Sequence, residues 1–165
     1  HCSRLPMRSG NMTVNGDHVV RLEFTSAVEM VDFVQVVSDH VGRTFGFDDD
    51  AIHWVGVALR ESVVNAIKHG NGNDVTKHVF VDFGRAPDSE LPGLMISVRD
   101  QGAGFDPDTL ENPLEPDNLL KPGGRGIFLI RNFMDEVEMQ RAPQGGMEIR
   151  MVKRLHPTGQ PAASS

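Results

Sequence analysis

Three short segments that combine glycine with polar residues occur in a fixed order along this chain, and each has the pattern of a different junction. The segment 61–70 reads as a helix that ends at Gly70. The segment 100–106 follows an apolar, strand-like run, and the segment 123–130 leads through glycines into an apolar helix. Together they predict one pocket bounded by a helix end, a strand end and a helix start.

Composition fits a single globular domain. Of the 165 residues, 39% are hydrophobic and 24% are charged, which is enough to bury a core. The net charge of -7 offers no basic field for a phosphate backbone, so we expect no direct nucleic-acid binding. The one cysteine, Cys2, cannot form an internal disulfide, and no apolar run is long enough to span a membrane. We therefore expect a cytoplasmic protein.

Hydrophobic periodicity predicts strands and helices over most of the chain. Strands are expected at 14–25, 75–84, 94–99, 136–141 and 147–153, and helices at 27–45, from Asp48 or Asp49 to His69, and at 126–133. Ser26 is the expected N-cap of the first helix. Four prolines interrupt 106–122, which we expect to form a lid. The predicted domain is 13–154, with 1–12 disordered or added ahead of the natural start, and 155–165 a flexible tail.

The first segment places a carboxylate and an amide on one side of a helix. At about 100° per residue, Glu61, Asn65 and His69 fall within one quadrant, and the opposite side carries an apolar stripe of Ile52, Leu59, Val63 and Ile67. The face is either simply solvated or functional. In the functional interpretation the Asn65 amide oxygen binds Mg²⁺, and Glu61 deprotonates or orients the attacking hydroxyl or water. His69 either caps the helix end or touches phosphate.

The second segment places an aspartate just beyond a strongly apolar strand. The Asp100 carboxylate there can accept a hydrogen bond from an exocyclic amine such as that of adenine. Gly102 and Gly104 would let the backbone approach a flat base without a side-chain clash. The alternative is an ordinary turn at a strand end.

The third segment offers backbone N–H groups to an anion. Gly124, Arg125 and Gly126 come directly before an apolar helix, whose positive N-terminus favours phosphate. Arg125 either adds a charged contact or faces solvent, and a glycine-led helix is often only a turn. Three such segments in one short chain make ATP binding the leading hypothesis.

The three segments resemble the N, G1 and G2 boxes of the GHKL ATPases, the superfamily that includes gyrase, histidine kinases and MutL. The strings LRESVVNAIKHG at 59–70 and GIFLIRNFMDEV at 126–137 are more specifically similar to the anti-sigma-factor serine/threonine kinases of the RsbW/SpoIIAB type. The resemblance covers about 14–153. It implies a two-layer α/β sandwich, with a mixed, mostly antiparallel sheet and helices on one face.

The resemblance also implies roles for individual residues. Glu61 matches the catalytic base, Asn65 the Mg²⁺ ligand and Asp100 the adenine-binding aspartate. The matching glycines of the G1 and G2 boxes are Gly102, Gly104, Gly124 and Gly126. Such proteins use ATP and Mg²⁺, form homodimers, bind a sigma factor and phosphorylate an anti-anti-sigma (STAS-type) partner.

Two other functions remain open from the sequence. One is a non-catalytic, nucleotide-gated protein-binding module of the same fold, although such a module has no need of the base Glu61. The other is a detached histidine-kinase ATPase domain. Too few residues precede the second helix for a phospho-accepting helical hairpin, which disfavours this alternative within the given chain.

Overall fold

The structure is a computed structural model, and it describes residues 18–87, 91–102 and 124–156. The expected N-terminal segment 1–12, the whole of the expected lid at 106–122 and most of the tail lie outside these ranges. Of the tail, Leu155 is described, and its backbone N–H donates to the Pro92 carbonyl at 2.7 Å.

The described elements follow the order strand, two helices, two strands, helix, two strands. They are β1 (His18–Thr25), α2 (Met30–Phe45), α3 (Asp49–Asn65), the π-helical turn η1 (Ala66–Gly70), β2 (His78–Arg85), β3 (Gly93–Arg99), α5 (Gly124–Phe133), β4 (Glu136–Arg141) and β5 (Met147–Arg154). Every predicted helix and strand is present, with ends that differ by a few residues.

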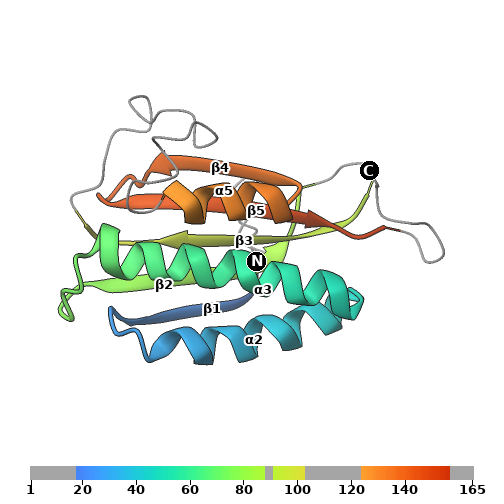
Figure 1. The fold of residues 1–165 in the computed structure, drawn as a ribbon, viewed down its shortest axis with the longest axis horizontal. Helices are drawn as coiled ribbons and strands as arrows, with labels where there is room; N and C mark the ends of the chain where they lie inside the picture. The colour runs from blue at the N-terminus through green and yellow to red at the C-terminus, as the bar shows by residue number, and fades with distance from the viewer. Residues whose placement is uncertain (1–17, 88–90, 103–123, 157–165) are drawn as a thin grey trace, which may run out of the picture.

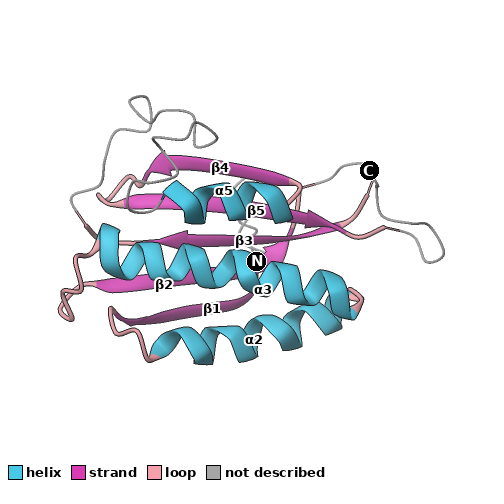
Figure 2. Cartoon of the chain, viewed as in Figure 1, coloured by secondary structure: helices cyan, strands magenta, loops and turns pink. Residues whose placement is uncertain are grey.

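The five strands form one sheet, and the helices lie over one of its faces. The strand order is β1-β2-β3-β5-β4, and all four pairings among the described strands are antiparallel. Figures 1 and 2 show α2, α3 and α5 side by side in front of the sheet, with α3 in the middle. The predicted two-layer α/β sandwich is confirmed.

Alternation along the strands creates the core between these layers. In β2, Val79, Val81 and Phe83 are fully buried beneath the helices, while the residues between them are half-buried on the other face. The predicted stripe of α3 is confirmed, because Ile52, Leu59, Val63 and Ile67 are all buried. Burial of this stripe fixes the rotation of α3 and turns Glu61 and Asn65 away from the core.

The predicted start of the second helix is confirmed at Asp49, and the predicted cap of the first helix is wrong. The Asp48 side chain accepts a hydrogen bond from the Ala51 N–H at 2.8 Å and caps α3. Ser26 does not cap α2, which begins only at Met30 with Glu29 at its N-cap. The Ser26 hydroxyl instead donates to the Lys77 carbonyl at 2.7 Å, because β1 and β2 bring these two segments together.

The end of α3 widens into a π-helical turn. The Asn71 N–H donates to the Ala66 carbonyl at 2.8 Å, a bond across five residues instead of four. The spacing of 100° per residue therefore holds for Glu61 and Asn65 but does not extend to His69, which is exposed. Single π-turns of this kind often occur at functional sites.

Among the described ranges, no helix combines the length and the hydropathy that crossing a bilayer requires.

Candidate functional site

Glu61 and Asn65 lie directly against the first turn of α5. A Cβ added to Gly126 would lie 2.8 Å from Glu61 Oε1 and 3.0 Å from Asn65 Nδ2. Both side chains are half-buried, and Gly126 itself is buried. The first and third sequence segments, which are far apart in the chain, thus meet at one place because α5 packs on α3.

The start of α5 supplies the backbone donors at this place. The helix begins at Gly124, and the N–H groups of its first turn have no acceptor within the helix itself. The positive end of the helix dipole therefore lies beside the Glu61 carboxylate and the Asn65 side-chain amide. The Arg125 side chain and the whole of Gly104 lie outside the residues that the structure describes.

Asp100 lies at the end of β3 and is only 5% exposed. Its Oδ1 accepts two backbone N–H groups, from Gly102 at 3.0 Å and from Met147 at 3.1 Å. Its own N–H donates to the Met147 carbonyl at 3.0 Å. These bonds fix the carboxylate at the end of β3. The other carboxylate oxygen, Oδ2, accepts neither of these two N–H groups.

Burial raises the pKa of Asp100 above its ordinary value of 3.8. The two backbone hydrogen bonds and the nearby charges of Lys77 and Arg99 lower the pKa and offset part of this effect. None of the described residues forms an ion pair with Asp100, and a carboxylate buried in this way lowers stability at neutral pH. Such groups are often retained for function.

Glycines allow three segments to meet around Asp100. A Cβ on Gly70 would overlap Asp100 Oδ2, and a Cβ on Gly102 would overlap the Gly70 carbonyl. In the β4–β5 turn, Gly146 has a φ of +86° and lies against the Asp100 carbonyl. Side chains at these positions would push η1, the strand end and the hairpin apart.

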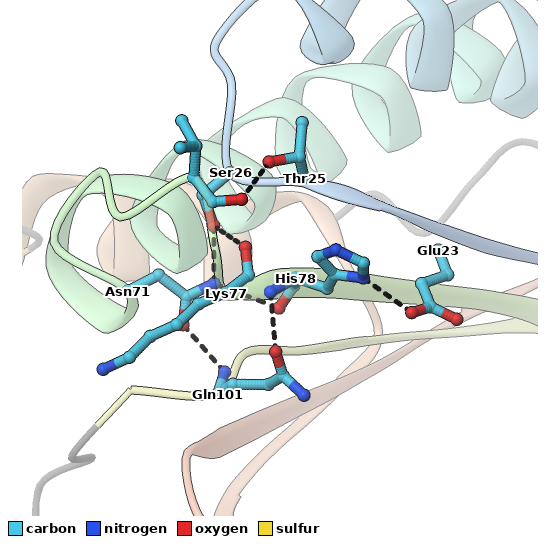
Figure 3. Close-up of polar contacts among 8 residues, drawn as sticks. Glu23, Thr25, Ser26, Asn71, Lys77, His78 and Gln101 are labelled. Carbon is cyan, nitrogen blue, oxygen red and sulfur yellow. Dashed lines mark hydrogen bonds and ion pairs between the residues drawn. The ribbon is translucent and has the colours of Figure 1, made fainter.

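Sequence reasoning missed several residues of this site. The sequence pattern identifies Gly70 only as the end of a helix and Met147 only as the start of a strand, and it assigns no role to Asn71 or Gly146. Asn71 is 3% exposed and hydrogen-bonds to Ser26, His78 and Gln101 (Figure 3). The signal in the sequence is a glycine followed by an asparagine at a helix end, but periodicity does not reveal which segment lies opposite.

The structure thus places the described candidates in two groups. Glu61 and Asn65 lie with Gly126, and Asp100 lies with Gly102 and the end of η1. The first group lies on the last turns of α3, and the second lies at Gly70, where η1 ends. Both are found toward the left of Figure 1. Within the described ranges, no three or more histidine, cysteine or acidic side chains gather in a way that could hold a metal ion.

Comparison with known proteins agrees with this geometry. Residues 24–153 match the histidine kinase-like ATPase domain. The chain is 28% identical over 151 residues to the serine-protein kinase RsbW of Bacillus subtilis, which covers 88% of this chain and 90% of the relative. It is 33% identical over 138 residues to the anti-sigma F factor of Oceanobacillus iheyensis, covering 81% and 90%. The chain therefore belongs to the histidine kinase-like ATPase domain family, in the branch of the RsbW serine-protein kinases and anti-sigma F factors.

Proposed function

We propose that this protein is an ATP-dependent protein-serine/threonine kinase that acts as an anti-sigma factor. It binds a sigma factor, and it transfers the γ-phosphoryl group of ATP to a hydroxyl of an anti-anti-sigma partner of the STAS type. The printed names of its relatives, serine-protein kinase and anti-sigma F factor, support this assignment. By the same resemblance we propose that it works as a homodimer.

The observation that carries the proposal is the contact of Glu61 and Asn65 with Gly126. The start of α5 binds the phosphates of ATP through backbone N–H groups. The Glu61 carboxylate accepts the proton of the serine or threonine hydroxyl while the hydroxyl oxygen forms a bond to the γ-phosphorus. The bond from that phosphorus to the bridging oxygen breaks, and ADP leaves.

The donor set beside Gly126 fits Mg²⁺. An amide oxygen and a carboxylate are hard oxygen ligands, and Mg²⁺ usually takes only one or two protein ligands together with phosphates and waters. Asn65 would hold the ion through Oδ1. When bound, Mg²⁺ neutralises part of the phosphate charge.

Asp100 recognises the base. Its Oδ1 accepts the N–H groups of Gly102 and Met147. Because Oδ2 takes part in neither bond, this oxygen accepts the exocyclic amine of adenine. Because Gly70 and Gly102 carry no side chains and pack closely, the backbone can approach the base without a steric clash.

Calorimetry with ATP, with and without Mg²⁺, tests the nucleotide site on the wild-type protein and on Asp100→Asn. Mg²⁺-dependent binding that is weakened in the variant is the expected result. Failure of the wild-type protein to bind ATP would overturn the proposal and leave a nucleotide-independent binding module.

Phosphoryl transfer from radiolabelled Mg-ATP to purified STAS-domain proteins tests the activity. The product should resist acid, as phosphoserine and phosphothreonine do, whereas an acid-labile product would indicate a histidine kinase. ATP binding without any transfer to such a partner would favour the nucleotide-gated module.

A further inference from the structure

The amide side chain of Asn71 joins four segments of the chain next to Asp100 and Gly102 (Figure 3). Its Oδ1 accepts the Gln101 backbone N–H at 2.8 Å. Its Nδ2 donates to Ser26 Oγ at 2.7 Å and to the His78 carbonyl at 3.0 Å. The end of η1 is thereby tied to the β1–α2 connection, to the start of β2 and to the chain beyond β3.

The chemistry of the neighbours fixes the orientation of this amide. The Gln101 backbone N–H can only donate, and the His78 carbonyl can only accept. Exchange of the amide oxygen and nitrogen would therefore break both bonds. Asn71 uses both of its amide hydrogens and its oxygen, and the side chain is almost completely excluded from solvent.

Two sets of bonds hold the segment that contains Asp100. On the helix side, Asn71 binds the Gln101 N–H, and the Gln101 side chain accepts the His78 N–H at 2.7 Å. On the hairpin side, Met147 binds the Asp100 carboxylate and backbone. Gln101 lies between Asp100 and Gly102, so a shift at Gln101 moves both neighbours.

We propose that Asn71 is a positioning residue that sets the direction of the Asp100 carboxylate and thereby the preference for adenine. Asn71 acts through the Gln101 backbone and does not itself contact the base. This inference rests on the proposed function, because it takes Asp100 to be the group that accepts the adenine amine.

Substitution of Asn71 by aspartate tests this role at nearly constant shape. The new carboxylate has no hydrogen to donate, so it cannot bind the His78 carbonyl and would repel it. Asn71→Ala removes all three bonds. Ser26→Ala is the mildest variant for the Asn71 amide, because it removes only one of its three partners, together with the Ser26 hydrogen bond to the Lys77 carbonyl.

The measurement is the dissociation constant for Mg-ATP and for Mg-inosine triphosphate, which has a carbonyl oxygen in place of the adenine amine. We expect Asn71→Asp and Asn71→Ala to weaken ATP binding by about tenfold or more, as the loss of a hydrogen bond to a charged group would. Binding of inosine triphosphate should change by less than about twofold, because that nucleotide lacks the exocyclic amine that Asp100 accepts in the proposed adenine site. The preference for ATP should therefore fall.

A purely structural role for Asn71 would weaken both nucleotides by the same factor, and that result would overturn the proposal. If the Asn71 variants do not fold, Ser26→Ala decides, because it should lower the preference in the same direction by a smaller factor. An unchanged preference for ATP over inosine triphosphate in Ser26→Ala would then contradict the proposal.

Arg154→Met is the matched control for lost stability. Arg154 pairs with Gly93 at the opposite end of β3, and its guanidinium binds Glu136 and the Pro87 and Leu91 carbonyls. This variant should melt at a lower temperature and keep the preference for ATP. If the wild-type protein showed no preference for ATP over inosine triphosphate, the adenine role of Asp100 would fail instead, and the two failures are thus distinguishable.

Discussion

Glu61 and Gly126 are in contact across the α3–α5 interface, so closely that a Cβ on Gly126 would lie 2.8 Å from Glu61 Oε1. The same Cβ would lie 3.0 Å from Asn65 Nδ2. Such separations are below ordinary van der Waals contact. One glycine therefore allows a carboxylate, an amide and a helix start to share one position.

Gly126→Ala should strongly reduce kinase activity. The added methyl group displaces Glu61 and Asn65, and a misplacement of about 1 Å can lower the rate about a hundredfold. Stability should change little, because alanine favours the α5 helix by about 0.5–1 kcal/mol and offsets part of the clash. Phosphoryl transfer and thermal unfolding should be measured together. Asn132→Ala, at an exposed position of the same helix, is the control and should retain activity. Full activity in Gly126→Ala would contradict the assignment of this site.

Glu61→Gln should separate binding from chemistry. Glutamine keeps the shape of the side chain but cannot take a proton, so kcat should fall by about a hundredfold or more. ATP affinity should stay within about tenfold of wild type, since a base acts on the transition state. Calorimetry gives the ATP affinity, and single-turnover phosphoryl transfer gives the rate of the chemical step. A parallel loss of both would indicate a structural role for Glu61.

Asp100→Asn should weaken ATP binding by about ten- to a hundredfold, the effect of losing a hydrogen bond to a charged acceptor. The asparagine Oδ1 can still accept the Gly102 and Met147 N–H groups, so the fold should persist. Equal ATP affinity in the variant and the wild-type protein would refute the role of Asp100 in adenine binding.

The same substitution should change how stability depends on pH. Burial raises the pKa of Asp100 in the folded state above 3.8, so the folded state binds more protons than the unfolded state between the two pKa values. The contribution of Asp100 to stability is therefore present below pH 3.8 and declines as the pH rises through the folded pKa. Urea midpoints from pH 4 to 7 should show wild type losing stability relative to Asp100→Asn. The reverse slope would show that the hydrogen bonds outweigh burial.

Ser38→Ala should leave the protein equally stable or make it more stable, by up to about 1 kcal/mol. The Ser38 hydroxyl is buried in α2 and has no hydrogen-bond partner among the described residues, so it carries a desolvation penalty. Ser62→Ala is a matched control, because the buried Ser62 hydroxyl in α3 donates to the Ala58 carbonyl at 2.9 Å. Chemical denaturation should show that Ser38→Ala is more stable than Ser62→Ala, and the opposite order of stability would contradict the prediction.

Local patterns were sufficient to predict the elements of this fold. The stripe of Ile52, Leu59, Val63 and Ile67 gave α3 and its buried side, because helical period and core burial are properties of a short stretch. Hydrophobic periodicity also predicted the last two strands, and β4 begins and ends where predicted, at Glu136 and Arg141. The glycine pattern indicated where α5 begins to within two residues.

Patterns were misleading in two places, at Ser26 and at residues 75–77. Ser26 has the chemistry of a helix cap, but its hydroxyl binds the Lys77 carbonyl and the Asn71 amide. Residues 75–77 look like strand, yet β2 begins only at His78, where pairing with β1 starts. At Ser26 a contact across about 50 residues outweighed a local preference, whereas residues 75–77 form a turn in which the Lys77 N–H donates to the Asp74 carbonyl at 2.9 Å.

The sequence by itself determined which residue types were available: an acid and an amide four apart, an aspartate beyond an apolar strand, and glycines before a helix. Only the tertiary structure decided that Gly126 touches Glu61 and Asn65, that Gly70 closes on Asp100, and that Asn71 binds Gln101. Periodicity fixes which way a side chain faces within its own element. The partner it meets depends on how α3, α5 and the sheet pack, because that packing is selected by the burial of the whole core.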